Sequence, residues 1–161
     1  MNGSTTMTQR TLILTLSLVA TLFGSGCSRG FDIKTPDGFA ELDDAEGYRY
    51  RATSADGVVL AVRREKNEPK GSLDFWAAAV GNELTSRGYG KPAVESLKSQ
   101  NGTAGKKLAF RTVKNGRPSV LWVAVFVSDD RVVVVETGGD ADHFSQVESK
   151  VSAALSALVV G

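Results

Sequence analysis

The 161-residue sequence has one cysteine, Cys27, one histidine, His143, and nearly equal numbers of basic and acidic residues. One cysteine cannot form an internal disulfide, and one histidine with one cysteine cannot supply the four ligands of a structural zinc site. With 19 Lys and Arg against 18 Asp and Glu, the chain lacks the positive charge of a general nucleic-acid-binding protein. We therefore expect no cofactor, no metal and no nucleic-acid partner.

Uncharged and mainly apolar residues occupy positions 11–23, directly after Arg10. A helix of about 13 residues is roughly 20 Å long, which is too short for a hydrocarbon core of about 30 Å. The length and position instead fit the apolar region of a secretory signal peptide. We therefore expect residues 1–26 to be an export signal rather than a membrane span. Translation from either Met1 or Met7 keeps the basic residue ahead of the apolar run.

Small residues precede Cys27, and this arrangement resembles the lipobox of bacterial lipoproteins, although Gly24 stands where the lipobox usually has leucine. The resemblance implies cleavage before Cys27, diacylation of its thiol and a lasting membrane anchor, since several acyl chains bind a bilayer far more firmly than one. The alternative is a free cysteine beside an ordinary cleavage site, with an exported thiol exposed to oxidation. Ser28 follows the cysteine where Asp would signal retention in the inner membrane. The resemblance thus implies an outer-membrane lipoprotein of the bacterial cell envelope that faces the periplasm.

On this interpretation, residues 27–35 form the lipidated N-terminus and tether, and residues 36–161 form a single domain. Removal of residues 1–26 takes away one arginine and no acid, which leaves 18 basic and 18 acidic side chains. A net charge of zero argues against binding to anionic lipid or nucleic acid by bulk attraction. The expected interactions are with the membrane, through the lipid anchor, and with a protein partner.

Turn residues and alternating apolar residues predict several strands in the domain. Asp56-Gly57, Asn101-Gly102 and Asn115-Gly116 tolerate the positive φ of tight hairpin turns, and Asp129-Asp130 predicts a fourth turn. The strands predicted between these turns cover residues 48–53, 58–63, 93–99, 106–113, 120–127 and 131–137. The segment 120–127 is apolar on both faces, which predicts a central strand that is covered on both sides.

Two segments have the apolar periodicity of helices. In residues 72–87 the apolar positions are Leu73, Trp76, Ala77, Val80 and Leu84, with Ser72 as the expected N-cap and Gly88 as the expected stop. In residues 140–159 they are Phe144, Val147, Val151, Ala154, Leu155 and Leu158, with Asp140 as the expected cap. Gly138-Gly139 is interpreted as a linker before this second helix. The order of elements predicts an α+β domain whose antiparallel sheet is flanked by two main helices.

The order of the predicted elements resembles the PsbP-like fold. The features that carry this resemblance are the early Pro36-Asp37-Gly38-Phe39, the hairpin that ends in residues 63–67, the Trp-bearing helix and the strand meander before a C-terminal helix. The resemblance covers roughly residues 31–160 and rests on element order and apolar pattern. It implies an α+β domain that acts as a binding or assembly module. No catalytic residue carries over from it.

Arginines flank the first predicted hairpin, and one tyrosine stands between two glycines in a predicted loop. Arg49, Arg51 and Arg63 are suited to an anionic partner such as a peptide carboxylate or a glycan phosphate. Tyr89, between Gly88 and Gly90, is suited to recognition if it is exposed. Solvated strand faces, protection of a sheet edge and a tyrosine folded back onto the sheet are the alternative explanations. These four residues are the predicted ligand-binding residues.

His143 is the one imidazole available for catalysis, and Asp140, Asp142 and Ser145 lie close to it in sequence. Side chains on one helical turn fan outward, whereas a catalytic triad needs contacts near 3 Å between its members. The sequence also has no Gly-x-Ser-x-Gly, His-Glu-x-x-His or P-loop motif. We therefore expect a non-enzymatic envelope module with no catalytic residues. The alternative is an envelope hydrolase that uses His143.

Overall fold

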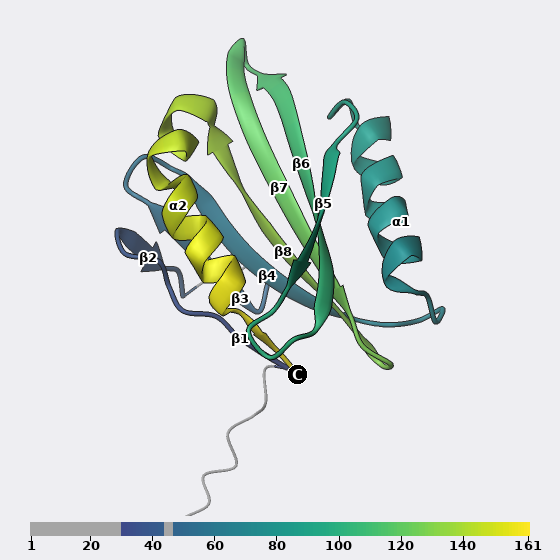
Figure 1. The fold of residues 1–161 in the computed structure, drawn as a ribbon. Helices are drawn as coiled ribbons and strands as arrows, with labels where there is room; N and C mark the ends of the chain where they lie inside the picture. The colour runs from purple at the N-terminus through teal and green to yellow at the C-terminus, as the bar shows by residue number, and fades with distance from the viewer. Residues whose placement is uncertain (1–29, 44–46) are drawn as a thin grey trace, which may run out of the picture.

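The computed structural model describes residues 30–43 and 47–161, which form nine strands and two helices (Figure 1). The strands are β1 (Phe31–Asp32), β2 (Phe39–Glu41), β3 (Tyr50–Ser54), β4 (Val59–Lys66), β5 (Ala93–Lys98), β6 (Ala104–Lys114), β7 (Arg117–Val127), β8 (Arg131–Asp140) and β9 (Val159–Val160). The helices are α1 (Leu73–Ser86), between β4 and β5, and α2 (Ala141–Ala157), between β8 and β9. The leader and Cys27 lie outside the described residues.

Seven of the strands form one antiparallel sheet in the order β2-β3-β4-β8-β7-β6-β5. The predicted hairpin turns are confirmed, and β6 and β7 run right up to Asn115-Gly116, where Lys114 pairs with Arg117. Asn115 has a φ of 52° and Gly116 a φ of 76°, the left-handed conformations that this turn requires. β4 pairs with β8 although α1 and three strands separate them in sequence.

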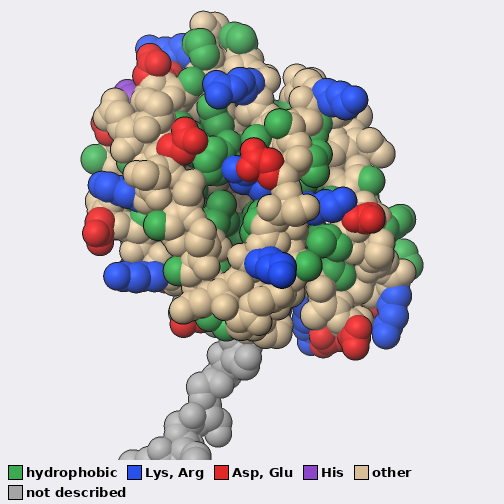
Figure 2. Space-filling model, viewed as in Figure 1, with side chains coloured by type: hydrophobic (Ala, Val, Ile, Leu, Met, Phe, Trp, Pro, Cys, Tyr) green, Lys and Arg blue, Asp and Glu red, His purple; other side chains and the backbone are tan. Residues whose placement is uncertain are grey.

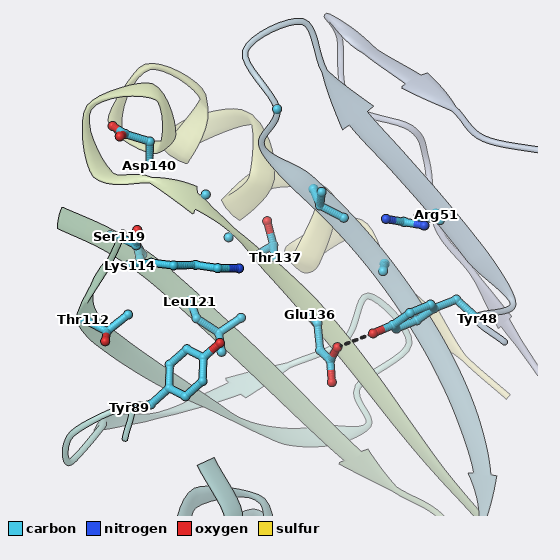
Figure 3. Close-up of a pocket in the computed structure, with 16 residues that line it drawn as sticks. Tyr48, Arg51, Tyr89, Thr112, Lys114, Ser119, Leu121, Glu136, Thr137 and Asp140 are labelled. Carbon is cyan, nitrogen blue, oxygen red and sulfur yellow. Dashed lines mark hydrogen bonds between the residues drawn. The ribbon is translucent and has the colours of Figure 1, made fainter. Parts of the chain in front are cut away.

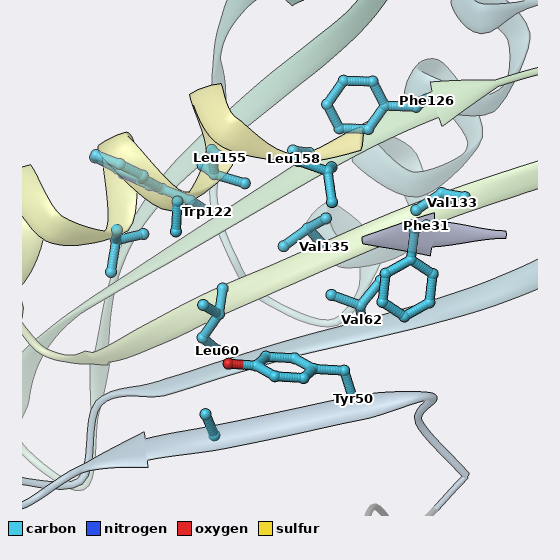
Figure 4. Close-up of a cluster of buried hydrophobic side chains, with 14 of the residues drawn as sticks. Phe31, Tyr50, Leu60, Val62, Trp122, Phe126, Val133, Val135, Leu155 and Leu158 are labelled. Atoms are coloured by element: carbon cyan, nitrogen blue, oxygen red, sulfur yellow. The ribbon is translucent and has the colours of Figure 1, made fainter. Parts of the chain in front are cut away.

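The two helices lie on opposite faces of the sheet (Figure 1). α1 packs on β6 and β7, and α2 packs on β7 and β8. Along β7, Trp122 and Phe126 belong to the core beneath α2, whereas Val123 and Val125 belong to the core beneath α1. The prediction of a central strand covered on both sides is therefore confirmed, and Figure 4 shows the core on the α2 side.

The predicted helix caps are present. Ser72 Oγ accepts a hydrogen bond of 3.2 Å from the Phe75 amide, and Gly88 has a φ of 92° directly after the C-cap. Asp140 caps α2 by accepting a 3.0 Å hydrogen bond from the Asp142 amide. α2 ends at Ala157, earlier than predicted, because the following residues are extended and Val159–Val160 pair with β1.

The interpretation of Gly138-Gly139 as a linker is wrong. Both glycines belong to β8 and pair with Leu121 and Val120 of β7. A Cβ atom on Gly138 would lie 2.5 Å from the carbonyl oxygen of Val120, which is far inside van der Waals contact. Glycine is needed here because the strands approach closely, and β8 continues directly into α2.

The two ends of the described domain meet at one end of the sheet. β1 and β9 form a separate two-stranded antiparallel sheet, and the Gly161 amide donates a 3.0 Å hydrogen bond to the Gly30 carbonyl. Phe31, which was expected to lie in the tether, is 8% exposed and packs in the core beneath α2. Among the described residues, the helices are all too short or too polar to span a bilayer.

Candidate ligand-binding site

The sheet face that carries α1 is covered by that helix only over part of its width. Beside α1 lies a depression of about 520 Å³, which we call the α1-face hollow (Figure 3). Its volume falls within the range of roughly 300–1,000 Å³ that is typical of ligand pockets. The lining residues come from β3, β4, β6, β7 and β8, from their flanking turns and from the loop between α1 and β5: Tyr48, Arg51, Gly57, Val59, Ala61, Tyr89, Thr112, Lys114, Ser119, Val120, Leu121, Glu136, Thr137, Gly138, Gly139 and Asp140.

Small and apolar residues form the floor of the hollow. Ala61 of β4 and Gly138 of β8 present little or no side chain, and Val59 and Leu121 flank them. Because successive side chains of a strand point to opposite faces, Leu60 and Val62 instead enter the core beneath α2. The glycine that the packing of β8 on β7 requires thus also keeps the hollow open.

A hydrogen-bonded group fixes one wall of the hollow. The Tyr48 hydroxyl donates a 2.8 Å hydrogen bond to Glu136 Oε2, and Arg63 Nη2 lies 2.6 Å from Glu136 Oε1. Partial burial raises the pKa of Tyr48, and its hydrogen bond to the Glu136 carboxylate raises it further. Tyr48 therefore stays neutral, and its donated hydrogen bond holds Glu136 in place.

Tyr89 and Lys114 form the opposite wall. Tyr89 follows α1, and its ring meets Phe110 edge to face, with the ring centres 6.0 Å apart. Lys114, at the end of β6, extends toward the middle of the hollow (Figure 3). Within residues 30–43 and 47–161, the Lys114 ammonium has no carboxylate within ion-pair distance. The hollow thus offers one unpaired cation and one aromatic ring opposite a fixed carboxylate.

Two of the four predicted ligand-binding residues, Arg51 and Tyr89, line the hollow. Arg63 reaches it through its ion pair with Glu136. Arg49 is exposed and does not line the hollow, although its backbone amide donates to the Val62 carbonyl.

Sequence reasoning missed Tyr48, Lys114 and Glu136 as residues of this site. A signal was present for Glu136, because it is a lone charged residue that directly follows the run of four valines 132–135. A charge at that place in a central strand needs a partner or a polar cavity. Lys114 offered no such signal, because a lysine beside a hairpin turn is usually solvated.

The residues around His143 do not form a triad in the structure. Ser145 Oγ donates a 2.7 Å hydrogen bond to the Asp142 carbonyl, and the Asp140 carboxylate caps the helix. In the described part of the chain, no hydrogen bond or ion pair joins His143 to another side chain. The hydrolase alternative gains no geometric support from this turn of α2.

The seven-stranded sheet with one helix on each face defines a class of α+β domain, and solved structures of the same class are similar to it. LpqN of Mycobacterium tuberculosis, described as involved in cell envelope biogenesis, matches with a TM-score of 0.63 and 11% identity over 81% of this chain and 82% of that one. Cyanobacterial PsbP from Synechocystis sp. PCC 6803 matches with a TM-score of 0.57 and 14% identity over 85% and 90%. A Bacteroides thetaiotaomicron structure matches with a TM-score of 0.54 and 11% identity over 82% and 45%.

These likenesses show that the domain has the PsbP-like fold, as the sequence predicted. No protein-family model matches the sequence, and no curated protein is significantly similar to it. At identities of 11–14% the solved structures support the fold alone.

Proposed function

We propose that this protein is a lipid-anchored module of the bacterial cell envelope that binds a ligand or partner protein in the α1-face hollow and catalyses no reaction. The observation that carries the proposal is the hollow itself, in which Lys114 and Tyr89 face the fixed Glu136 over a floor of small residues. These groups suit recognition of a molecule that places an anionic group at the ammonium and an apolar surface on the floor.

The position of the hollow suits a protein anchored at its N-terminus. Lys114, Ser119 and Asp140 lie near the β6–β7 turn, whereas Gly30 lies at the opposite end of the sheet beside β9 (Figure 1). An anchor at Cys27, three residues before Gly30, would leave the upper part of the hollow facing away from the bilayer. The description of LpqN as involved in cell envelope biogenesis also favours an envelope role. We place the protein at the outer membrane, facing the periplasm, on the resemblance of its leader to a lipobox.

The anchor is tested by mass spectrometry of the mature N-terminus and by membrane fractionation of the Cys27→Ser variant. We expect a diacylated Cys27 in the wild-type protein and release of the variant from the membrane fraction. An uncut leader, or a variant that sediments with membranes in the wild-type proportion, would contradict lipid anchoring.

The hollow is tested by photo-crosslinking in intact envelopes. A photoreactive side chain at Thr112, inside the hollow, should give a specific crosslinked product, and the same group at Ser152 on α2 should not. Adding Lys114→Glu should abolish the product, whereas Lys34→Glu, an exposed lysine outside the hollow, should leave it unchanged. Equal products from both positions, or no product from Thr112, would contradict the proposal.

A further inference from the structure

β5 is an open edge of the seven-stranded sheet. It pairs with β6 on one side only, and all of its residues are exposed except the partly buried Leu97. The opposite edge strand, β2, has only three residues, whereas β5 has six. Natural proteins usually shorten, bend, cover or charge such edges, because an exposed edge pairs with other chains.

The usual protections are few in β5, whose one charge left unpaired by the described residues, Lys98, is its last residue. Its register with β6 runs without a bulge from Ala93 to Lys98, and it contains no proline. The charge of Glu95 is neutralised on the sheet face by Lys107, whose Nζ lies 2.9 Å from Glu95 Oε2 and 4.2 Å from the Trp122 ring centre. Val94 is 55% exposed. β5 therefore has the features of a strand that accepts a partner.

A groove runs along each face of this edge, mainly apolar on the α1 side and with charged and polar rims on the α2 side. On the α1 side, a groove of about 490 Å³ lies between the helix and β5 over Leu108 and Val94. The helix has no side chain at Gly81 in this groove, and a Cβ atom there would lie 3.1 Å from the Leu108 side chain. On the α2 side, a groove of about 470 Å³ lies over Trp122 and Phe144. Figure 2 shows hydrophobic side chains on both sides of the ridge that β5 forms.

The charge of the edge selects the kind of partner. Lys106 is paired with Asp74 at 2.6 Å and Lys107 with Glu95 at 2.9 Å, and Glu148 and Arg111 add one charge of each sign to the α2-side groove. Lys91 and Lys98 stand at the two ends of β5, exposed and, within the described ranges, without an ion pair. At about 3.3 Å per residue these lysines are roughly 23 Å apart along the strand. Two unpaired cations at this spacing favour an extended segment that carries an acid near each end.

We propose that β5 is a docking edge for an acidic, extended segment of a partner protein, which adds to the sheet as an eighth strand. Main-chain hydrogen bonds to the free side of β5 hold the segment, as in other cases of strand addition. Its alternate apolar side chains pack against Val94 on one face and toward the α2-side groove on the other. Its acidic ends pair with Lys91 and Lys98. This surface is distinct from the α1-face hollow, and the proposal does not depend on a ligand there.

The test is a titration of the full ¹⁵N-labelled chain with an eight-residue peptide that has glutamate at both ends and alternating valine and threonine between them. We expect the largest amide shift changes at residues 93–98. A peptide of the same sequence with alternate amides N-methylated keeps the charges but cannot pair as a strand. We expect it not to bind. Equal binding of the methylated peptide would overturn strand addition.

Two charge-reversed variants test the partner's charge. Lys91→Glu combined with Lys98→Glu should weaken binding about tenfold, because two attractive contacts become repulsive. Lys34→Glu combined with Lys70→Glu makes the same change in net charge outside the edge and its grooves, and should leave binding unchanged. Since all four lysines are exposed, folding should survive in both variants. Equal weakening in the two pairs would overturn the charge assignment.

Three further outcomes would also overturn the proposal. One is the absence of any shift at a peptide concentration of roughly 1 mM, where even a weak strand addition is visible. Another is shift changes that map to the α1-face hollow rather than to β5. The last is movement of the β5 signals when the protein alone is diluted, which would show that the edge is occupied by a second copy of the chain.

Discussion

Two side-chain amides, that of Asn67 and that of Asn101, bridge segments far apart in the sequence. Asn67 is 5% exposed, and its Nδ2 donates to the carbonyls of Gly71 and Ser128 while its Oδ1 accepts from the Trp76 indole at 2.7 Å. This network places the start of α1 against the β7–β8 turn. Asn101 does the same at the chain terminus, where Nδ2 donates to the Val160 carbonyl at 2.7 Å and Oδ1 accepts from the Val160 amide at 3.1 Å.

Replacing Asn101 with alanine should destabilise the protein by about 2 kcal/mol, because two backbone groups of Val160 lose their partners in a partly buried position. Urea unfolding followed by circular dichroism measures the change. Asn101→Asp keeps the acceptor and loses the donor, so its loss should be intermediate. Gln100→Ala, at an exposed neighbouring side chain, should have almost no effect, and a comparable loss there would contradict this role of Asn101.

Tyr48 should make the protein sensitive to alkaline pH. Burial raises its pKa above the ordinary value of 10.0, so the folded state binds the phenolic proton more tightly than the unfolded state does. This contribution to stability is complete below pH 10 and is lost as the pH rises through the folded pKa. Unfolding free energies measured from pH 8 upward should therefore fall above pH 10. Tyr48→Phe should reduce that slope and also cost about 1 kcal/mol at neutral pH through the lost hydrogen bond. An unchanged slope would contradict the assignment.

Elements with local signals were predictable from the sequence, and those built from distant segments were not. The helix α1 was predictable from its N-cap Ser72, its stop at Gly88 and its 3.6-residue apolar period. The β6–β7 hairpin was predictable from Asn115-Gly116, because caps and turns act within a few residues. The pairing of β1 with β9 joins residues 31–32 to 159–160 and leaves no local signature. The α1-face hollow was predicted only in part, because it depends on which strands α1 leaves uncovered.

The error at Gly138-Gly139 has a physical origin and can be tested. Paired glycines usually mark loops, but here a Cβ on Gly138 would meet a backbone carbonyl at 2.5 Å, whereas one on Gly139 would lie 3.2 Å from a side-chain methyl and 3.3 Å from the Cα of Val58. Gly138→Ala should therefore cost about 2–3 kcal/mol, because the main chain of β7 cannot move away easily. Gly139→Ala should cost clearly less, because a shift of a few tenths of an ångström relieves these longer contacts. Thermal unfolding of the two variants gives the comparison, and equal losses would contradict close strand approach as the reason for glycine.

In the molecule as a whole, the β1–β9 pairing and the β6–β7 turn, beside which Lys114 lines the hollow, lie at opposite ends of the sheet (Figure 1). Phe31 and Val160 are 8% and 5% exposed and belong to the core beneath α2. Any force applied at the N-terminus by an anchor therefore acts first on the β1–β9 pairing. The seven-stranded sheet, which carries the hollow, would bear such a force only after the β1–β9 pairing.

Removal of residues 159–161 should abolish the pairing of β1 with β9, while the seven-stranded sheet should remain folded. The loss of the buried Val160 side chain, its pairing with Phe31 and its hydrogen bonds to Asn101 should cost about 3 kcal/mol. Hydrogen exchange should accelerate at the amides of residues 31–32 and of the 99–103 turn, but not at β7. Removal of Gly161 alone gives up only the bond to Gly30 and should cost less than about 1 kcal/mol. Equal acceleration of exchange in β7 and at Phe31 would contradict this expectation, because β1 and β9 would then unfold as one cooperative unit with the sheet. An anchor at the N-terminus would in that case transmit its load directly to the hollow.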